Sequence, residues 1–134
     1  MKNKILIHTD GGARGNPGPA AVGIVISRLS AGEQAFGEYI GETTNNEAEY
    51  RALIIALKKV KELSDGKDIS EIECYADSEL MVKQLNREYK IKDLGLRGFF
   101  LEIAGLKAEL KVPISFHYVR REENAEADSL VNEI

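Results

Sequence analysis

Residues 4–19 read KILIHTDGGARGNPGP, a stretch that combines a strand pattern with a loop pattern. Its first part, residues 4–10, is apolar and β-branched and predicts a strand that ends at Asp10. The glycines and prolines of residues 11–19 predict a loop, because both residue types interrupt regular structure. A carboxylate is therefore expected at the end of an apolar strand, directly before a loop.

The segments that follow predict a meander and then a helix. Residues 21–27 and 33–41 predict two further strands, with a turn at residues 29–32, which makes three antiparallel strands in a row. Apolar residues at helical spacing run from about residue 46 to residue 63. Thr44 and Glu47 form a capping-box pattern at the start of this helix, and Asp65-Gly66 ends it.

The second half of the chain alternates between strands and helices. Residues 69–77 predict a fourth strand, residues 78–86 a helix, and residues 94–110 another helix, although Gly95, Gly98 and Gly105 lower its propensity. A fifth strand at residues 114–119 and a closing helix at residues 124–134 follow. This order predicts an α/β fold, a mixed sheet flanked by helices. The length of 134 residues predicts a single domain over residues 1–134.

The composition is that of an ordinary globular protein. Hydrophobic residues make up 43% and charged residues 30%, which argues against a disordered or fibrous chain. No signal-peptide pattern and no apolar stretch of membrane-spanning length is visible. The one cysteine, Cys74, excludes an intramolecular disulfide and is expected to be a small buried hydrophobe. It fits a reducing compartment, so we expect a cytoplasmic monomer.

The net charge of −4 argues at first against a polyanionic partner. The argument is weak, because a site built from carboxylates carries excess negative charge until divalent metals bind. Basic residues are also concentrated between Lys83 and Lys111. They could contact phosphates, and a solvated helix surface explains them equally well.

Four carboxylates lie where acids are not expected. Asp10 and Asp77 each follow an apolar strand, at the end where ligand sites form in sheets with parallel neighbours. If the first and fourth strands are adjacent and parallel, these two acids lie side by side. Glu49 shares a helix face with the apolar positions 53, 56 and 60. Asp128 has apolar neighbours at positions 127, 130 and 131 of the last helix.

Any one of these acids alone is more simply explained as a capping or salt-bridged side chain. All four together are costly beside a core, because like charges in proximity resist ionisation. Hard cations with oxygen ligands neutralise such a cluster, and the absence of a Cys/His cluster favours Mg²⁺ or Mn²⁺ over Zn²⁺. A two-metal carboxylate site suits phosphodiester hydrolysis, in which one ion activates water and the other steadies the leaving oxygen.

Four sequence blocks, in order and at matching spacing, resemble the type 1 ribonucleases H. They are TDGGARGNPGPA (residues 9–20), TTNNEAE (43–49), DSE (77–79) and REENAEADSL (121–130). The resemblance covers essentially the whole chain. It implies a ribonuclease H-like fold, a five-stranded mixed sheet in the order 3-2-1-4-5 with helices on both faces. It also implies a hydrolase, an endonuclease that cuts the RNA strand of RNA/DNA hybrids and leaves 5′-phosphate and 3′-hydroxyl ends.

The resemblance implies roles for single residues as well. The metal-binding catalytic acids, which hold two Mg²⁺ with Mn²⁺ as a substitute, are Asp10, Glu49, Asp77 and Asp128. The substrate-binding residues are Asn16, Thr44, Asn45 and Asn46. The asparagine amides would recognise 2′-hydroxyls, and Thr44 would hold a phosphate of the DNA strand. Turn and cap chemistry also explains asparagines in loops, and for Asn45 and Asn46 both roles can hold together.

The chain departs from the family pattern before the last helix. Many bacterial members carry a histidine in a loop there, but residues 119–124 (VRREEN) are too short for that loop and contain no histidine. We therefore expect activity without histidine, and leave open whether Arg121, Glu122 or Glu123 partly substitutes. His8 and His117 fall within predicted strands and are expected to be packed or surface residues.

A second departure concerns substrate binding. The basic protrusion of the family, rich in Trp and Lys, is missing, and the chain contains no Trp. Affinity is therefore expected to depend strongly on salt. Glu79 stands where a glutamine often contacts the substrate, which puts that contact in doubt.

Three alternatives remain open at this point. The same site could also act on double-stranded RNA. The chain could be a non-catalytic nucleic-acid-binding module, although clustered acids facing a polyanion argue against this. It could also be a domain of a larger polypeptide, such as a reverse transcriptase or a fused phosphatase. Because it starts at Met1 and ends soon after Val131, we expect a free-standing protein.

Overall fold

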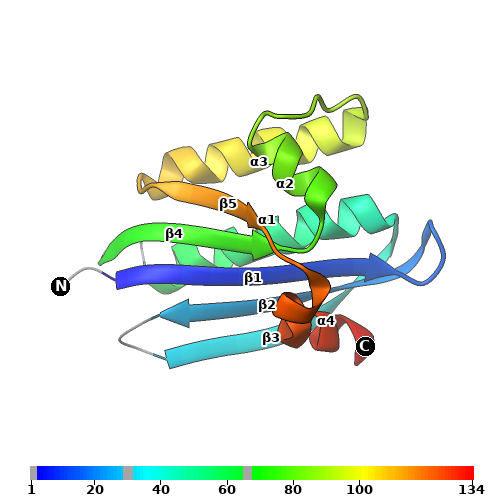
Figure 1. The fold of residues 1–134 in the computed structure, drawn as a ribbon, viewed down its shortest axis with the longest axis horizontal. Coiled ribbons are helices and arrows are strands. Elements are labelled where there is room, and N and C mark those ends of the chain that lie inside the picture. The colour runs from blue at the N-terminus through cyan, green and yellow to red at the C-terminus, as the bar shows by residue number, and fades with distance from the viewer. Residues whose placement is uncertain (1–2, 29–31, 65–67) are drawn as a thin grey trace.

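The computed structural model describes residues 3–28, 32–64 and 68–134 (Figure 1). In chain order the elements are β1 (Asn3–Ala13), β2 (Gly18–Arg28), β3 (Gly32–Thr43), α1 (Asn45–Ser64), β4 (Ile69–Ala76), α2 (Glu79–Leu85), α3 (Leu94–Leu110), β5 (Ile114–Tyr118), the 3₁₀ turn η1 (Arg121–Asn124) and α4 (Ala125–Asn132). Most of the turn predicted at residues 29–32, and the helix end predicted at Asp65-Gly66, lie outside the described residues.

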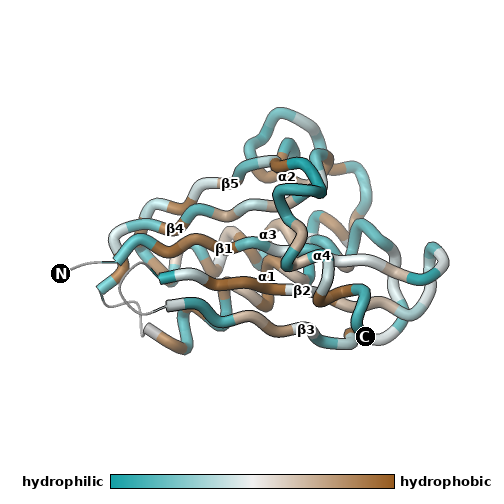
Figure 2. Tube along the Cα trace, turned by 60° about the horizontal axis from the view of Figure 1, so that its bottom comes forward, coloured by the Kyte–Doolittle hydropathy of each residue, from teal (hydrophilic) through white to brown (hydrophobic). Residues whose placement is uncertain are grey.

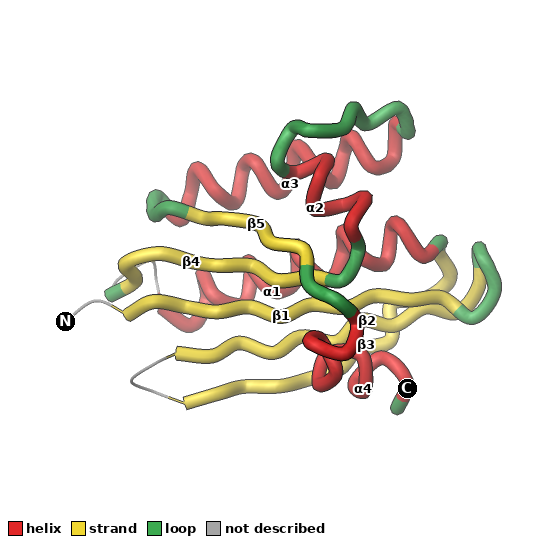
Figure 3. The backbone as a smooth tube through the Cα atoms, viewed as in Figure 1, coloured by secondary structure: helices red, strands yellow, loops and turns green. Residues whose placement is uncertain are grey.

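The strands form one five-stranded sheet in the order β3-β2-β1-β4-β5. β1 pairs antiparallel with β2, β2 pairs antiparallel with β3, and β1–β4 and β4–β5 are parallel. The predicted mixed sheet in the order 3-2-1-4-5 is confirmed. Helices α1 and α3 lie on one side of the sheet, and α4 lies on the other side over β1, β2 and β3 (Figures 1 and 3).

The core lies between the sheet and α1. Apolar residues at alternate positions of β1, such as Ile5 and Ile7, are fully buried, because successive side chains of a strand point to opposite faces. They meet Leu53 and Leu57, which the helical spacing places on the inner face of α1. In Figure 2 the central strands β1 and β2 are coloured as hydrophobic along much of their length. None of the described helices is long and apolar enough to cross a membrane.

β1 is longer than predicted, and this changes the setting of Asp10. The strand continues to Ala13 and β2 starts at Gly18, so the loop predicted over residues 11–19 is wrong except at residues 14–17. The antiparallel ladder with β2 continues through Gly11, Gly12 and Ala13, which holds these residues in the strand. Parallel pairing with β4, in contrast, stops at Thr9. Asp10 is therefore the first residue of β1 beyond the end of β4.

Candidate metal centre

Asp10 lies opposite a glycine that allows a helix to approach closely. It is 7% exposed, and its partner across the β1–β2 ladder is Gly23. A Cβ at Gly23 would lie 2.1 Å from the backbone oxygen of Ala127 in α4. The backbone of α4 thus rests directly on β2 beside Asp10. Asp128, the next residue of α4, lies near enough to Asp10 to help raise the pKa of that acid.

Glu49 reaches the same place from the opposite side of the sheet. A Cβ at Gly11 would lie 2.4 Å from the backbone of Ala48, so the first turn of α1 packs closely against β1. The Glu49 carboxylate, 9% exposed, accepts a hydrogen bond from the Gly11 backbone N–H at 2.9 Å. Because Gly11 directly follows Asp10, this bond holds the Glu49 carboxylate next to Asp10.

Asp77 follows β4 directly, next to the end of the β1–β4 pairing. Its side chain is 7% exposed, and its Oδ2 is buried without a hydrogen-bond partner. The Nε of Arg121 lies 3.8 Å from that oxygen, on a side chain that is 79% exposed. A buried carboxylate oxygen without a hydrogen-bond donor is costly and is available to a metal ion.

The structure brings three of the four predicted acids into one cluster. One carboxylate oxygen from each of Asp10, Glu49 and Asp77 can be chosen so that all lie within 4.8 Å of one another. The fourth acid, Asp128, is not among these three but helps to raise the pKa of Asp10, and it accepts a hydrogen bond from Asn132 at 3.4 Å. Three buried or nearly buried carboxylates with no histidine or cysteine form an oxygen-only donor set, which fits a hard divalent cation.

The electrostatics of the cluster reflect this proximity. Burial, and then the negative charge of Asp77, raise the pKa of Asp10 from 3.8 to about 8. Burial, followed by the charge of Asp10, raises the pKa of Glu49 well above its ordinary value. Without a cation the cluster therefore retains protons, because its carboxylates cannot all ionise so close together.

The predicted substrate-binding residues surround the end of β1. Asn16, in the β1–β2 loop, accepts a hydrogen bond through Oδ1 from the Asn45 backbone N–H at 2.9 Å. Asn45 in turn accepts through Oδ1 from the Ala13 backbone N–H at 2.8 Å. Both amides use their oxygen within the protein, and their Nδ2 groups remain as donors. Asn46 is exposed in the first turn of α1.

Thr44 precedes α1 and caps it, as predicted. Its Oγ1 accepts from the Glu47 backbone N–H at 3.2 Å. Glu47 reaches back to the Thr44 hydroxyl, with Oε2 and Oγ1 3.4 Å apart. The cap chemistry expected for this segment is thus present, next to the exposed asparagines.

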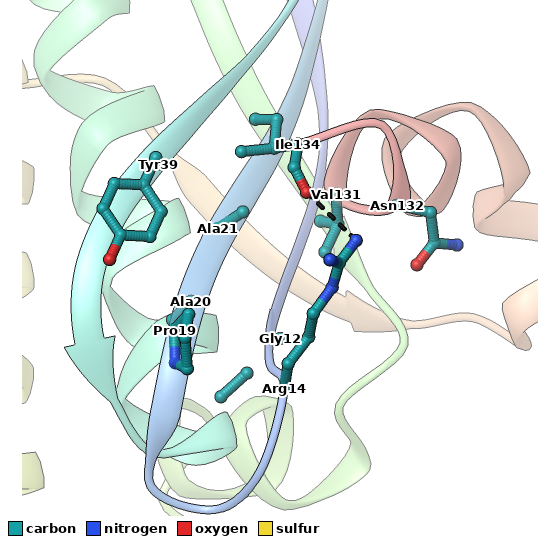
Figure 4. A pocket seen from close by; sticks show the side chains of 10 residues that line it. Gly12, Arg14, Pro19, Ala20, Ala21, Tyr39, Val131, Asn132 and Ile134 are labelled. Carbon is teal, nitrogen blue, oxygen red and sulfur yellow. Dashed lines mark hydrogen bonds between the residues drawn. The ribbon is translucent and has the colours of Figure 1, made fainter.

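Helix α4 is attached at both ends by residues that the sequence prediction did not include. At its start, Asn124 is 2% exposed and donates through Nδ2 to the Thr9 carbonyl oxygen at 2.8 Å. Beyond its end, Ile134 accepts from the Arg14 guanidinium at 3.1 Å. Arg14 and Ile134 line a cavity of about 230 Å³ whose other side is formed by Pro19 and Tyr39 (Figure 4). This cavity lies along the side of α4 and contains none of the four acids.

The two histidines form a separate ring stack across the sheet. The His8 and Tyr75 ring centroids are 4.9 Å apart, and those of Tyr75 and His117 are 5.1 Å apart. Burial lowers the pKa of the half-buried His8, and His117 is exposed. Both are packed or surface residues, as expected.

The close backbone approaches at Gly11 and Gly23 have a signal in the sequence. A glycine inside a strand often marks the place where another backbone approaches. Gly23 interrupts the apolar run of residues 21–26, and Gly11 follows Asp10. The position of Arg121 beside Asp77 has no comparable signal, because it depends on how η1 is placed.

Comparisons with known proteins agree with this geometry. Residues 8–134 match the family model described as reverse transcriptase-like. A bifunctional protein of Mycobacterium tuberculosis is 35% identical over 97% of this chain, and the ribonuclease HI of Halobacterium salinarum is 38% identical over 97%. The chain spans 35% and 63%, respectively, of the lengths of these two relatives. It covers 94% of the ribonuclease H of Erythrobacter litoralis, at 32% identity.

Solved structures agree as well. The crystal structure of LC11-RNase H1 in complex with an RNA/DNA hybrid superposes with a TM-score of 0.90, at 46% identity, over 96% of this chain and 94% of that one. The RNase H1 structure from Halobacterium salinarum gives a TM-score of 0.87 at 37% identity, over 97% of this chain and 96% of that one. With the sheet order, the sequence blocks and these relatives in agreement, the chain belongs to the type 1 ribonuclease H family.

Proposed function

We propose that this protein is a divalent-metal-dependent endonuclease that hydrolyses the RNA strand of RNA/DNA hybrids by a two-metal-ion mechanism, leaving 5′-phosphate and 3′-hydroxyl ends. The observation that carries the proposal is that carboxylate oxygens, one each from Asp10 in β1, Glu49 in α1 and Asp77 just after β4, lie within 4.8 Å of one another. The hybrid bound by LC11-RNase H1, at 46% identity, supports the substrate class.

In this proposal the metal ligands are Asp10, Glu49, Asp77 and Asp128. Two Mg²⁺ ions held there, or Mn²⁺ in their place, would activate the attacking water and stabilise the leaving oxygen. The Gly11 N–H orients the Glu49 carboxylate through the bond of 2.9 Å. Arg121 contributes positive charge at the exposed rim, 3.8 Å from Asp77.

The substrate-binding residues of the proposal are Asn16, Thr44, Asn45 and Asn46. Because Asn16 and Asn45 use their Oδ1 atoms within the protein, they would approach the hybrid as donors. Donors can bind the oxygen of a 2′-hydroxyl, which RNA has and DNA lacks. Thr44 would hold a phosphate of the DNA strand. The free Cys74 is compatible with a reducing compartment, which supports the further proposal of a cytoplasmic location. We also propose a monomer, which size-exclusion chromatography tests.

A strand-specific cleavage assay tests the proposal. A hybrid labelled on the RNA strand in one sample and on the DNA strand in another is incubated with Mg²⁺, with Mn²⁺ and with EDTA. Only the RNA strand should be cut, only with a divalent ion, and the products should bear 5′-phosphates. Cleavage that survives EDTA, or cutting of the DNA strand, contradicts the proposal. Double-stranded RNA in a parallel lane shows whether the site also accepts that substrate.

A further inference from the structure

We propose that Asn124 is a positioning residue for the metal centre: its buried amide holds η1 and α4 against β1, so that Asp128 and Arg121 reach Asp10 and Asp77. The inference rests on the proposed role of the carboxylate cluster as a metal site. The hydrogen bond of the Asn124 side chain goes to a backbone carbonyl and not to one of the four acids.

The amide attaches the end of the chain to the strand that carries the site. Asn124 is the last residue of η1 and directly precedes α4. Its Nδ2 donates to the Thr9 carbonyl oxygen at 2.8 Å, in a buried hydrogen bond between residues 115 positions apart. Thr9 immediately precedes Asp10, so the bond fixes η1 and α4 one residue away from the acid they must meet.

The side chain of Asn124 does not stabilise α4 by capping it. An asparagine before a helix ordinarily accepts a hydrogen bond from a free N–H of the first turn. Asn124 makes no such cap bond, and its Oδ1 is buried without a hydrogen-bond partner. The side chain thus leaves one acceptor unsatisfied while it makes a long-range bond. A residue that departs from a local preference in this way is expected near a functional site.

The position of Asn124 gives it influence over two residues of the site. Asp128 lies four residues later, on the same face of the helix, next to Ala127, whose backbone rests on Gly23, the ladder partner of Asp10. Arg121 lies three residues earlier in η1 and places its Nε 3.8 Å from Asp77 Oδ2. A small movement of this segment changes both positions together. Two other attachments remain if the amide bond is lost, the Ala127 contact with Gly23 and the Arg14–Ile134 bond.

The test compares Asn124→Leu with a matched control, Asn86→Leu. Asn86 also uses Nδ2 to bond a strand carbonyl, that of Phe116 at 3.1 Å, at the end of α2. Each variant therefore loses one side-chain-to-backbone hydrogen bond, but only Asn124 is bonded next to the acids. Three quantities are measured for wild type and both variants. They are the thermal midpoint of unfolding without metal, the Mn²⁺ dissociation constant by calorimetry, and the Mg²⁺ concentration that gives half-maximal hybrid cleavage.

Both variants should have lower thermal midpoints. Only Asn124→Leu should bind Mn²⁺ more weakly, by about tenfold or more, the range found when groups that orient metal ligands are removed. Its Mg²⁺ requirement should rise by a similar factor, with the KM for the hybrid unchanged. If Asn124→Leu does not fold, Asn124→Ala, which introduces no extra volume, replaces it in the comparison.

Equal Mn²⁺ affinity in the Asn124 and Asn86 variants would overturn the proposal and leave Asn124 a purely structural residue. Failure of the wild-type protein to bind Mn²⁺ would overturn it as well. If wild type binds Mn²⁺ but does not cut the hybrid, the proposed nuclease function fails, and the Mn²⁺ constants still decide the role of Asn124.

Discussion

Among single residues, the acids of the metal centre are governed first by burial, which disfavours their charged form, and then by repulsion between neighbouring carboxylates. Asp10 is the most informative of them, because burial and the charge of Asp77 raise its pKa to about 8. The same repulsion that makes the metal-free site unfavourable makes it attractive to a divalent cation. Protons and metal ions therefore compete for the cluster.

This competition predicts how stability depends on pH without metal. The pKa of Asp10 is higher in the folded protein than the ordinary value of 3.8, so the folded state binds more protons between about pH 4 and pH 8. The contribution of Asp10 to stability therefore falls as the pH rises through that window. In EDTA, the free energy of unfolding by urea should fall more from pH 5 to pH 8 in wild type than in Asp10→Asn. If the free energy of unfolding falls equally with pH in the two proteins, the raised pKa of Asp10 is contradicted. Adding Mg²⁺ should restore the stability of the wild-type protein at pH 8.

A second prediction concerns the histidines. His8 and His117 stack on opposite sides of Tyr75 and are not among the clustered acids. Replacing both, as His8→Asn and His117→Gln, should change the rate of hybrid cleavage and its pH profile by less than about twofold, because neither imidazole transfers a proton in the proposed reaction. Steady-state rates from pH 6 to pH 9 provide the measurement. A tenfold loss in a folded variant would show that a histidine takes part.

Among secondary-structure elements, the packing of α4 against β2 decides where Asp128 lies. Gly23→Ala would place a methyl group 2.1 Å from the Ala127 carbonyl oxygen and push the helix outward. We expect a loss of about 1–3 kcal/mol in unfolding free energy, as for other overpacked sites, together with weaker Mn²⁺ binding. Urea unfolding and calorimetry measure the two effects.

The control for this substitution is Gly105→Ala in α3. A Cβ at Gly105 meets no atom within 4 Å, and the residue lies inside the helix. This variant should gain about 0.5–1 kcal/mol, because alanine favours helix over glycine, and should bind Mn²⁺ as wild type does. If Gly23→Ala is as stable as wild type and binds Mn²⁺ equally well, α4 is not held as described.

The sequence predicted the elements well where apolar periodicity was clear. The helix expected over residues 94–110 is observed as Leu94–Leu110, in spite of its glycines, because Leu96, Ile103 and Leu106 are buried against the core. The predicted end of β1 at Asp10 was wrong, because cross-strand pairing with β2 overrides the turn preference of Gly11 and Gly12. Pairing between distant segments has no local signal.

For the whole molecule, the net charge of −4 requires that binding to a polyanion depend on local basic residues. Several residues of the basic stretch have partners within the protein: Lys83 pairs with Glu79, and Arg97 donates to the Ile91 carbonyl. Phosphate contacts should therefore be few and exposed. We expect the KM for the hybrid to rise about tenfold or more between 50 and 200 mM KCl, with kcat little changed. A KM that is independent of salt would argue against this mode of binding.

The acids of the site could be predicted from the sequence, but the residues that hold these acids in place could not. The four acids were found because carboxylates on apolar faces are unusual, and the structure brings Asp10, Glu49 and Asp77 together. The bond from Asn124 to Thr9 joins residues 115 positions apart, and an asparagine before a helix reads as an ordinary cap. Long-range side-chain bonds of this kind depend on the completed fold, so the sequence pattern does not reveal them.

In the proposed function, acids that are distant in the sequence form one metal site, and the location of bound Mn²⁺ in a crystal is the sharpest test of that site. Crystals of the wild-type protein grown at pH 7.5 with MnCl₂ would be measured for the anomalous scattering of manganese. We predict a peak in contact with the carboxylate oxygens of Asp10, Glu49 and Asp77, which is lost in Asp10→Asn. A wild-type protein that cuts the hybrid with Mn²⁺ but binds its manganese away from these acids would show that they are not the metal site.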